Sequence, residues 1–148
     1  MRITVMSRTD AIIYCYKPHE NKTVMISISD PYMGYEHFPF CTEENNIVAI
    51  LPLCFADADK PGYDVYGRTA GISDLMKDED GKKIADFLKQ YHDTEVIIHC
   101  DAGISRSTGV AGAILKYFTG DDSTIFDNAR FYPNMWCYRK TLQALEKQ

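Results

Sequence analysis

Residues 95–110 constrain the fold of this chain more than any other segment. They read Glu-Val-Ile-Ile-His-Cys-Asp-Ala-Gly-Ile-Ser-Arg-Ser-Thr-Gly-Val. The apolar, β-branched run at 96–98 predicts a buried strand that ends at Cys100. A short loop with Gly103 follows, and an apolar pattern of helical spacing opens at 106–108. A strand, a loop and a helix start in this order predict a cradle for an anion, because loop N–H groups point inward and the helix N-terminus adds its positive end.

Two side chains of this segment are suited to act on a phosphate held in that cradle. We expect the Cys100 thiol to ionise readily, because helix N-termini and nearby cations favour a thiolate. Arg106, six residues later, can return to the cradle and offer a planar fork of donors. The alternative is a core strand, turn and helix in which Cys100 is only a small buried apolar residue. That alternative leaves the charge of Arg106 without a purpose, so we favour a phosphate-binding loop with a built-in nucleophile.

The order of residues in the loop also gives a family resemblance. Residues 99–107, His-Cys-Asp-Ala-Gly-Ile-Ser-Arg-Ser, resemble the H-C-x5-R-[ST] signature of the cysteine-dependent protein tyrosine phosphatases. The run A-G-I-S-R-S within it resembles the dual-specificity branch of that superfamily. In the order of its elements, the resemblance covers most of the chain, residues 24–145. It implies a phosphatase-type fold and the hydrolysis of phosphomonoesters, with the preference for phosphotyrosine or phosphoserine/threonine left open.

Elsewhere the hydrophobic pattern alternates between strand and helix periods. Strands are predicted at 3–6, 24–29 and 47–55, besides the strand that leads to Cys100. Helices are predicted at 11–16 with Ser7 as N-cap, at 78–91, at 106–120, at 123–129 and at 135–145. This alternation predicts a single α/β domain over residues 1–148, with a mostly parallel central sheet of about four to five strands flanked by helices. Pro52 argues against a fully central position for the third predicted strand.

Two segments lack a clear period. Residues 32–46 are polar and aromatic, and we expect a loop there. Its His37 and aromatic side chains either line a pocket or, as we favour, fasten the loop to the core. Residues 63–77 are expected to form either a lid or a surface insertion.

The proposed chemistry also needs a carboxylic acid that protonates the leaving oxygen and later activates water. Asp57 and Asp59 follow the third predicted strand, and ligands in open α/β sheets bind at the carboxyl ends of the strands. Phe55-Ala56-Asp57, with Pro61-Gly62 after it, resembles the F-x-D segment that carries the general acid in regenerating-liver and related small phosphatases. We favour Asp57, with Asp59 as the alternative and Asp64 left open. The structural alternative is that these aspartates only cap a loop.

The expected reaction has two steps. Cys100 attacks phosphorus and forms a cysteinyl-phosphate, which water then hydrolyses. The Arg106 fork and the loop amides hold the phosphate oxygens, those amides belonging to Asp101, Ala102, Gly103, Ile104, Ser105 and Arg106. By resemblance, Ser107 stabilises the departing thiolate, His99 orients the loop and Asn134 braces it. Structural alternatives are a helix cap for Ser107 or Asn134 and a satisfied core position for His99. The mechanism requires no metal and no cofactor.

Charge and cysteine usage limit the expected partners. The formal net charge of -5 argues against nucleic acid or an anionic membrane surface as the main partner. The first residues lack the apolar core of a signal peptide, and no run is long enough to span a membrane. Five cysteines without a C-x-x-C pair favour a reducing, cytoplasmic setting. We expect a phosphorylated protein or a small phosphomonoester as substrate, and the sequence predicts no oligomeric state.

Three other functions compete with a protein phosphatase. A phosphoinositide phosphatase would need lysines inside the loop, where Asp101 stands instead. An RNA 5'-triphosphatase would need a basic surface. A phosphate-binding interaction module that has lost turnover is opposed by the intact Cys100 and Arg106, although the open choice of acid keeps it as an alternative. Cys54, on what is expected to be a neighbouring strand, is a candidate partner of Cys100 under oxidation.

Overall fold

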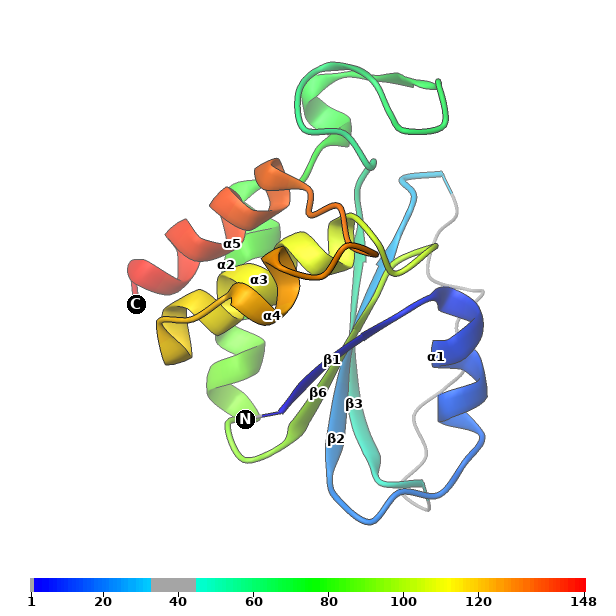
Figure 1. Ribbon diagram of the computed structural model, residues 1–148, viewed down its shortest axis with the longest axis vertical. Helices are drawn as coiled ribbons and strands as arrows, with labels where there is room; N and C mark the ends of the chain where they lie inside the picture. The colour runs from blue at the N-terminus through cyan, green and yellow to red at the C-terminus, as the bar shows by residue number, and fades with distance from the viewer. Residues whose placement is uncertain (1, 33–44) are drawn as a thin grey trace.

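The computed structural model describes residues 2–32 and 45–148 (Figure 1). The predicted loop at 32–46 falls mainly outside the described residues, and so do His37 and its neighbours Tyr35, Phe38 and Phe40.

A four-stranded sheet forms the centre of the molecule. Its strands are all parallel and lie in the order β1 (Ile3–Met6), β6 (Glu95–His99), β2 (Thr23–Ser29) and β3 (Ile47–Cys54). The four predicted strands are therefore confirmed. The residues of β2 and β6 are almost all buried, as expected for apolar runs covered on both faces. At the edge of the sheet, β3 accommodates Pro52 because an edge strand can lack a donor.

Helices cover both faces of this sheet (Figure 1). On one face, α1 (Arg8–Cys15) packs Ala11 and Cys15 against a small core that includes Met25 and Ile97. The larger core lies on the opposite face, under α2 (Asp78–Gln90), α3 (Arg106–Thr119) and α5 (Met135–Glu146). The α/β class with a parallel sheet flanked by helices is confirmed.

Local capping signals set most of the helix ends. Ser7 Oγ accepts a hydrogen bond from the N–H of Asp10 at 3.1 Å, so Ser7 is the N-cap of α1. Gly120 ends α3 with a φ of 75°, a left-handed conformation that favours glycine. The predicted helix at 123–129 is too long, because α4 spans only Ser123–Phe126. Asn128 Oδ1 accepts the N–H of Arg130 at 2.9 Å, and this Asx turn replaces the next helical turn.

Residues 63–77 fold partly as a hairpin, which the hydrophobic pattern did not predict. Strands β4 (Gly62–Tyr63) and β5 (Thr69–Ala70) pair antiparallel, and the short helix η2 (Ile72–Asp74) leads towards α2. The N–H of Val65 donates to the Asp57 carbonyl at 2.9 Å, which ties the hairpin to the end of β3. In Figure 1 the hairpin lies beyond the carboxyl ends of the strands, on the same side as the loop after β6.

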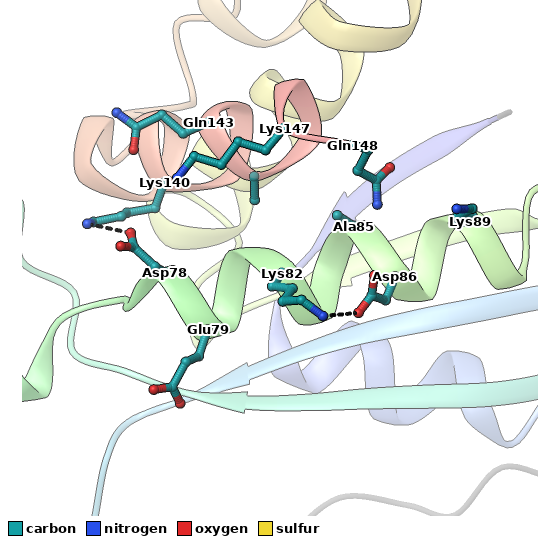
Figure 2. Close-up of a pocket in the computed structure, with 11 residues that line it drawn as sticks. Asp78, Glu79, Lys82, Ala85, Asp86, Lys89, Lys140, Gln143, Lys147 and Gln148 are labelled. Carbon is teal, nitrogen blue, oxygen red and sulfur yellow. Dashed lines mark hydrogen bonds and ion pairs between the residues drawn. The ribbon is translucent and has the colours of Figure 1, made fainter.

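A groove lies between α2 and α5, away from that edge (Figure 2). Two ion pairs lie within it, Lys140 with Asp78 at 2.8 Å and Lys82 with Asp86 at 3.2 Å. Among the described residues that line it there is no cysteine, serine or histidine. Judged by length and apolar character together, none of the helices within residues 2–32 and 45–148 qualifies as a membrane span.

Candidate active site

The loop between β6 and α3 turns its carbonyl groups outward. The N–H groups of Arg8, Tyr132 and Asn134 donate to the carbonyls of Asp101, Ile104 and Ser105 at 3.1, 2.9 and 2.9 Å. In contrast, no described residue accepts a hydrogen bond from the backbone N–H groups of residues 101–105. Because backbone donors are nearly always satisfied, a run of N–H groups without acceptors indicates a place for an anion.

Gly103 allows this loop to dock on the end of β1. Its φ is 72°, a conformation that side chains rarely adopt. A Cβ atom at this position would lie 2.6 Å from the carbonyl carbon of Met6 and 2.7 Å from the nitrogen of Ser7. The sequence therefore requires glycine here both for the turn and for the close approach of two backbones.

Cys100 lies at the base of the loop and is 2% exposed. Its Sγ atom is 3.1 Å from the Oγ atom of Ser107, in the first turn of α3. Either atom can donate in this contact, so the Ser107 hydroxyl is placed to hydrogen-bond the sulfur. Ser107 is thus in contact with the candidate nucleophile, in addition to its place in the helix start.

His99 is buried behind the loop as a neutral ring. Its Nδ1 atom is 3.0 Å from the Cys100 carbonyl, which can only accept, so Nδ1 carries the proton. Its Nε2 atom therefore accepts the hydroxyl of Ser27 on β2, at 2.7 Å. Burial lowers the pKa of His99 to about 4, although the Cys100 carbonyl acts in the opposite direction. The histidine links the loop to a neighbouring strand.

This buried histidine predicts a loss of stability in mild acid. Between pH 6.5 and pH 4 the unfolded chain protonates His99 and the folded chain does not, so folding weakens as the pH falls through this window. From pH 7 to pH 5 we expect the wild type to lose on the order of 2 kcal/mol more unfolding free energy than His99→Gln does. Urea denaturation at both pH values measures the difference. His92→Gln, at an exposed histidine, is the control and should behave like wild type; the same pH dependence in all three proteins would contradict a neutral His99.

Arg106 is 1% exposed, and one edge of its guanidinium is held by the protein. Nη1 donates to Asp30 Oδ1 at 2.9 Å and to the Phe55 carbonyl at 2.9 Å. Nε is buried and has no hydrogen-bond partner among the described residues. Burial alone would lower the pKa of Arg106, but the charges of Cys100 and Asp30 outweigh it and raise this pKa. A permanent cation with a buried donor that lacks an acceptor again indicates a place for an anion.

Asp57, the favoured acid, lies against the loop. Its Oδ1 atom accepts hydrogen bonds from Ser105 Oγ at 2.8 Å and from Asn134 Nδ2 at 2.9 Å. Oδ2 accepts none from the part of the chain that the structure describes, so it is the oxygen available for proton transfer. Asn134 also caps α5, since its Oδ1 accepts the N–H of Cys137 at 3.0 Å. Asn134 therefore caps α5 with its side-chain oxygen and contacts Asp57 with its side-chain nitrogen.

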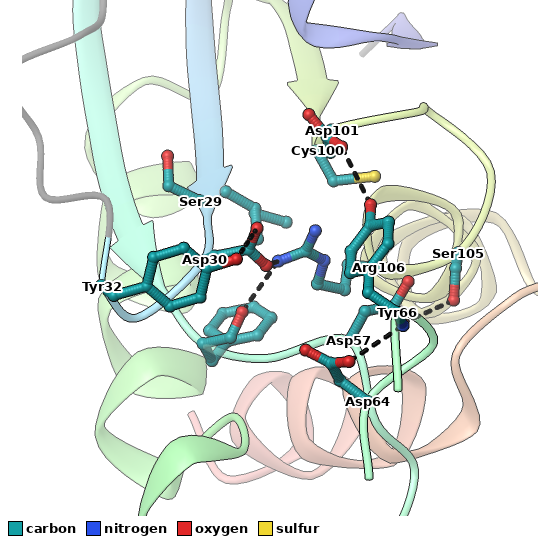
Figure 3. A network of polar contacts seen from close by, with 12 residues as sticks. Ser29, Asp30, Tyr32, Asp57, Asp64, Tyr66, Cys100, Asp101, Ser105 and Arg106 are labelled. Carbon is teal, nitrogen blue, oxygen red and sulfur yellow. Dashed lines mark hydrogen bonds and ion pairs between the residues drawn. The ribbon is translucent and has the colours of Figure 1, made fainter. Parts of the chain in front are cut away.

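The other two aspartates considered from sequence lie in different positions. Asp59 is exposed, and no hydrogen bond or ion pair joins it to a described residue of the loop. Asp64 Oδ1 accepts the N–H groups of Tyr66 and Arg68, both at 2.9 Å, and shapes the hairpin turn. The structure thus brings Cys100, Arg106 and Asp57 together (Figure 3), whereas neither Asp59 nor Asp64 has a hydrogen bond or ion pair with a described residue of the loop.

Sequence reasoning missed three polar residues that contact this group. Asp30 binds Arg106, Arg8 spans from α1 to Ser29 Oγ at 3.0 Å, and Tyr66 reaches Asp101. A usable signal existed for Asp30, which directly follows β2 just as Asp57 follows soon after β3. Residues at the carboxyl ends of neighbouring parallel strands converge on one edge of the sheet. The position of Asp30 in the sequence therefore predicts that it lies near Asp57.

No protein-family model and no curated protein matches this sequence. Among solved structures, the chain is similar to the human tyrosine phosphatase-like serine/threonine/tyrosine-interacting protein. The TM-score is 0.59 at 18% identity, over 98% of this chain and 91% of that one. It is also similar to PTPMT1 in complex with PI(5)P, with a TM-score of 0.56 at 14% identity over 99% and 91% of the two chains. For Tk-PTP in the active form the TM-score is 0.53 at 13% identity, over 100% and 94%.

These similarities cover nearly the whole of each chain, so the likeness is to a complete phosphatase-type fold. The chain has the fold of the cysteine-dependent protein tyrosine phosphatases, of the dual-specificity-like type. Identities this low show the fold alone, and the reaction and substrate have to be argued from the residues of this chain.

Proposed function

We propose that this protein hydrolyses phosphomonoesters, as a phosphatase of the protein tyrosine or dual-specificity kind, through a cysteinyl-phosphate on Cys100. The observation that carries the proposal is the set of donors without acceptors around one sulfur. It comprises the N–H groups of residues 101–105 and the buried Nε of Arg106. A phosphate has tetrahedral oxygens that can accept from these donors, and positioned donors supply most of the catalysis in phosphoryl transfer.

In the first step the Cys100 thiolate attacks phosphorus in line with the leaving oxygen. A sulfur–phosphorus bond forms, the phosphorus–oxygen ester bond breaks, and Asp57 gives its proton to the leaving oxygen. Oδ1 of Asp57 is already occupied by Ser105 and Asn134, so the proton resides on Oδ2. Asp30 and the Phe55 carbonyl hold Nη1 of Arg106, which fixes the guanidinium while Nε keeps no acceptor among the described residues.

In the second step water attacks the phosphorus of the cysteinyl-phosphate. Asp57, now a carboxylate, takes a proton from this water as the sulfur–phosphorus bond breaks and inorganic phosphate forms. The hydroxyl of Ser107, 3.1 Å from Sγ, donates to the departing thiolate. This hydrogen bond lowers the activation free energy of the second step. The enzyme then returns to its starting state, and water is the only other substrate that the reaction uses.

The role of Asp57 predicts a dependence on the leaving group. Asp57→Asn should lower kcat about 10²-fold or more on alkyl phosphates, whose leaving oxygen needs a proton. On activated aryl phosphates the loss in the first step should be much smaller, because their leaving oxygen departs as an anion. Asp59→Asn is the matched variant and should change neither rate by more than about twofold. Equal losses on both substrate types, or a larger loss in Asp59→Asn, would assign the acid elsewhere.

Turnover of a small aryl phosphate, with competition by vanadate, tests the proposal as a whole. Vanadate should compete because it mimics the geometry that the loop donors hold. A protein that binds vanadate at Cys100 and releases no phosphate would instead be an interaction module. The interaction module is the second candidate function, because the fold is similar to that of a tyrosine phosphatase-like interacting protein.

Protein or small phosphomonoesters are favoured as substrates over more highly charged ones. The PTPMT1 structure holds PI(5)P, but in this chain Asp101 occupies the loop position after the nucleophile, and no lysine lies in the loop. A net charge of -5 likewise disfavours RNA 5'-triphosphates and anionic membranes. We propose a reducing compartment such as the cytoplasm, because the mechanism requires Cys100 as a thiolate.

A further inference from the structure

The hairpin formed by residues 62–70 is fastened to the phosphate loop through Tyr66. Its hydroxyl donates to Asp101 Oδ2 at 2.9 Å, and Asp101 directly follows Cys100. Figure 3 shows the hydroxyl end of the Tyr66 ring directed towards Asp101, next to Cys100 in the chain. An aromatic side chain from a distant segment is therefore held against the residue that follows the candidate nucleophile.

A cation and a second ring hold Tyr66 from the other side. The Arg68 guanidinium carbon lies 4.8 Å from the centre of the Tyr66 ring and 4.7 Å from that of Tyr32. Arg68 is itself paired with Asp64 at 3.4 Å and with Asp30 at 3.9 Å. Because Asp30 also binds Arg106, the hairpin is coupled to both sides of the loop. Cation–π contacts of this kind restrict the ring to one orientation.

The ring keeps surface available for a substrate. Tyr66 is 45% exposed although its hydroxyl and one face are engaged. Burial and the hydrogen bond to Asp101 raise the pKa of Tyr66 to about 12, so the hydroxyl remains a donor at every pH at which the enzyme would work. The fixed, partly open ring is suited to contact a flat group that projects from a phosphate in the loop.

We propose that Tyr66 is a specificity-determining residue that contacts the aromatic ring of aryl phosphate esters, phosphotyrosine among them. This inference rests on the proposed function, and it names the substrate class of the same site. Aromatic rings attract one another in offset or edge-to-face packing beyond the area that they bury. A serine or threonine phosphate reaches the loop through a short aliphatic arm and lacks a ring to pack there. The segment at 63–77, predicted as a lid or an insertion, thus supplies one wall of the substrate pocket.

The test uses one peptide sequence carrying either phosphotyrosine or phosphoserine, and it compares wild type with Tyr66→Leu and Tyr66→Phe. Leucine fills similar space without an aromatic face. We expect Tyr66→Leu to lower kcat/KM about tenfold for the phosphotyrosine peptide, mainly through KM, and to change the phosphoserine value less than about twofold. Tyr66→Phe keeps the ring and loses the hydrogen bond to Asp101, so most of the phosphotyrosine preference should remain.

Tyr63→Leu is the matched control, because Tyr63 lies on the same hairpin and is 73% exposed. It should leave both kcat/KM values unchanged. Equal changes for the two peptides in Tyr66→Leu, a faster reaction in that variant, or no phosphotyrosine preference in wild type would overturn the role of Tyr66.

A binding measurement separates this inference from the proposed function. In a Cys100→Ser background, phosphotyrosine should bind more tightly than phosphoserine, and Tyr66→Leu should remove that difference. Turnover independent of Cys100 would defeat the hydrolase mechanism without bearing on this preference. An unchanged binding preference in Tyr66→Leu would defeat the role of Tyr66 and leave the hydrolase intact.

Discussion

Cys100→Ser should abolish turnover of aryl phosphates, with kcat reduced by at least about 10⁴-fold. Loss of a covalent nucleophile removes the two-step route itself, and the residual rate then comes from binding and from the loop donors alone. Serine is nearly isosteric, and Sγ of the buried Cys100 already lies 3.1 Å from a hydroxyl, so the fold should tolerate it. Phosphate release from p-nitrophenyl phosphate, with the melting temperature as a check on folding, measures the effect.

Cys54→Ser is the matched control, because Cys54 lies at the end of the edge strand β3 and not in the loop. Under reducing conditions it should retain the wild-type kcat. If the two cysteine variants lost activity equally, or if Cys100→Ser remained active, the nucleophile would have to be another group.

Arg106→Lys should lower kcat by about 10³-fold even though it keeps the positive charge. Arg106 donates to Asp30 and Phe55 with Nη1, and its Nε is a further donor that has no acceptor among the described residues. A lysine ammonium is a point donor that cannot reproduce this fork, and charge-stabilising arginines in phosphoryl transfer contribute effects of this size. Steady-state kinetics on the same aryl phosphate measures the loss.

The surface change Arg139→Lys on α5 controls for the exchange of arginine by lysine and should leave kcat unchanged. An Arg106→Lys enzyme within about tenfold of wild type would mean that the loop amides, without the guanidinium fork, supply the stabilisation. That result would contradict the arrangement described for the site.

The parts of the fold that could be predicted are those specified by short stretches of sequence. The apolar run before Cys100 and the capping signals at Ser7 and Gly120 act within a few residues, and the structure has a strand and helix ends at these places. The strand order and the register, in contrast, depend on packing between segments that the pattern of one segment does not contain.

The site shows the same division between local and distant information. Cys100 and Arg106 belong to one continuous loop, so their spacing and the intervening Gly103 predicted their proximity. The contact of Arg106 with Asp30 joins residues 76 positions apart, and no local pattern indicates it. The hairpin was missed because β4 and β5 have only two residues each, too few for any alternation to be visible.

The most direct test of the central claim is mass spectrometry of the enzyme quenched in acid during turnover. Ser107→Ala should be used beside wild type, because loss of its contact with Sγ slows breakdown of the intermediate more than its formation. We expect one phosphoryl group on the peptide that contains Cys100, in larger amount in Ser107→Ala. Turnover in which no phosphoryl group is found on Cys100, or in which it is found on another residue, would contradict the proposed mechanism.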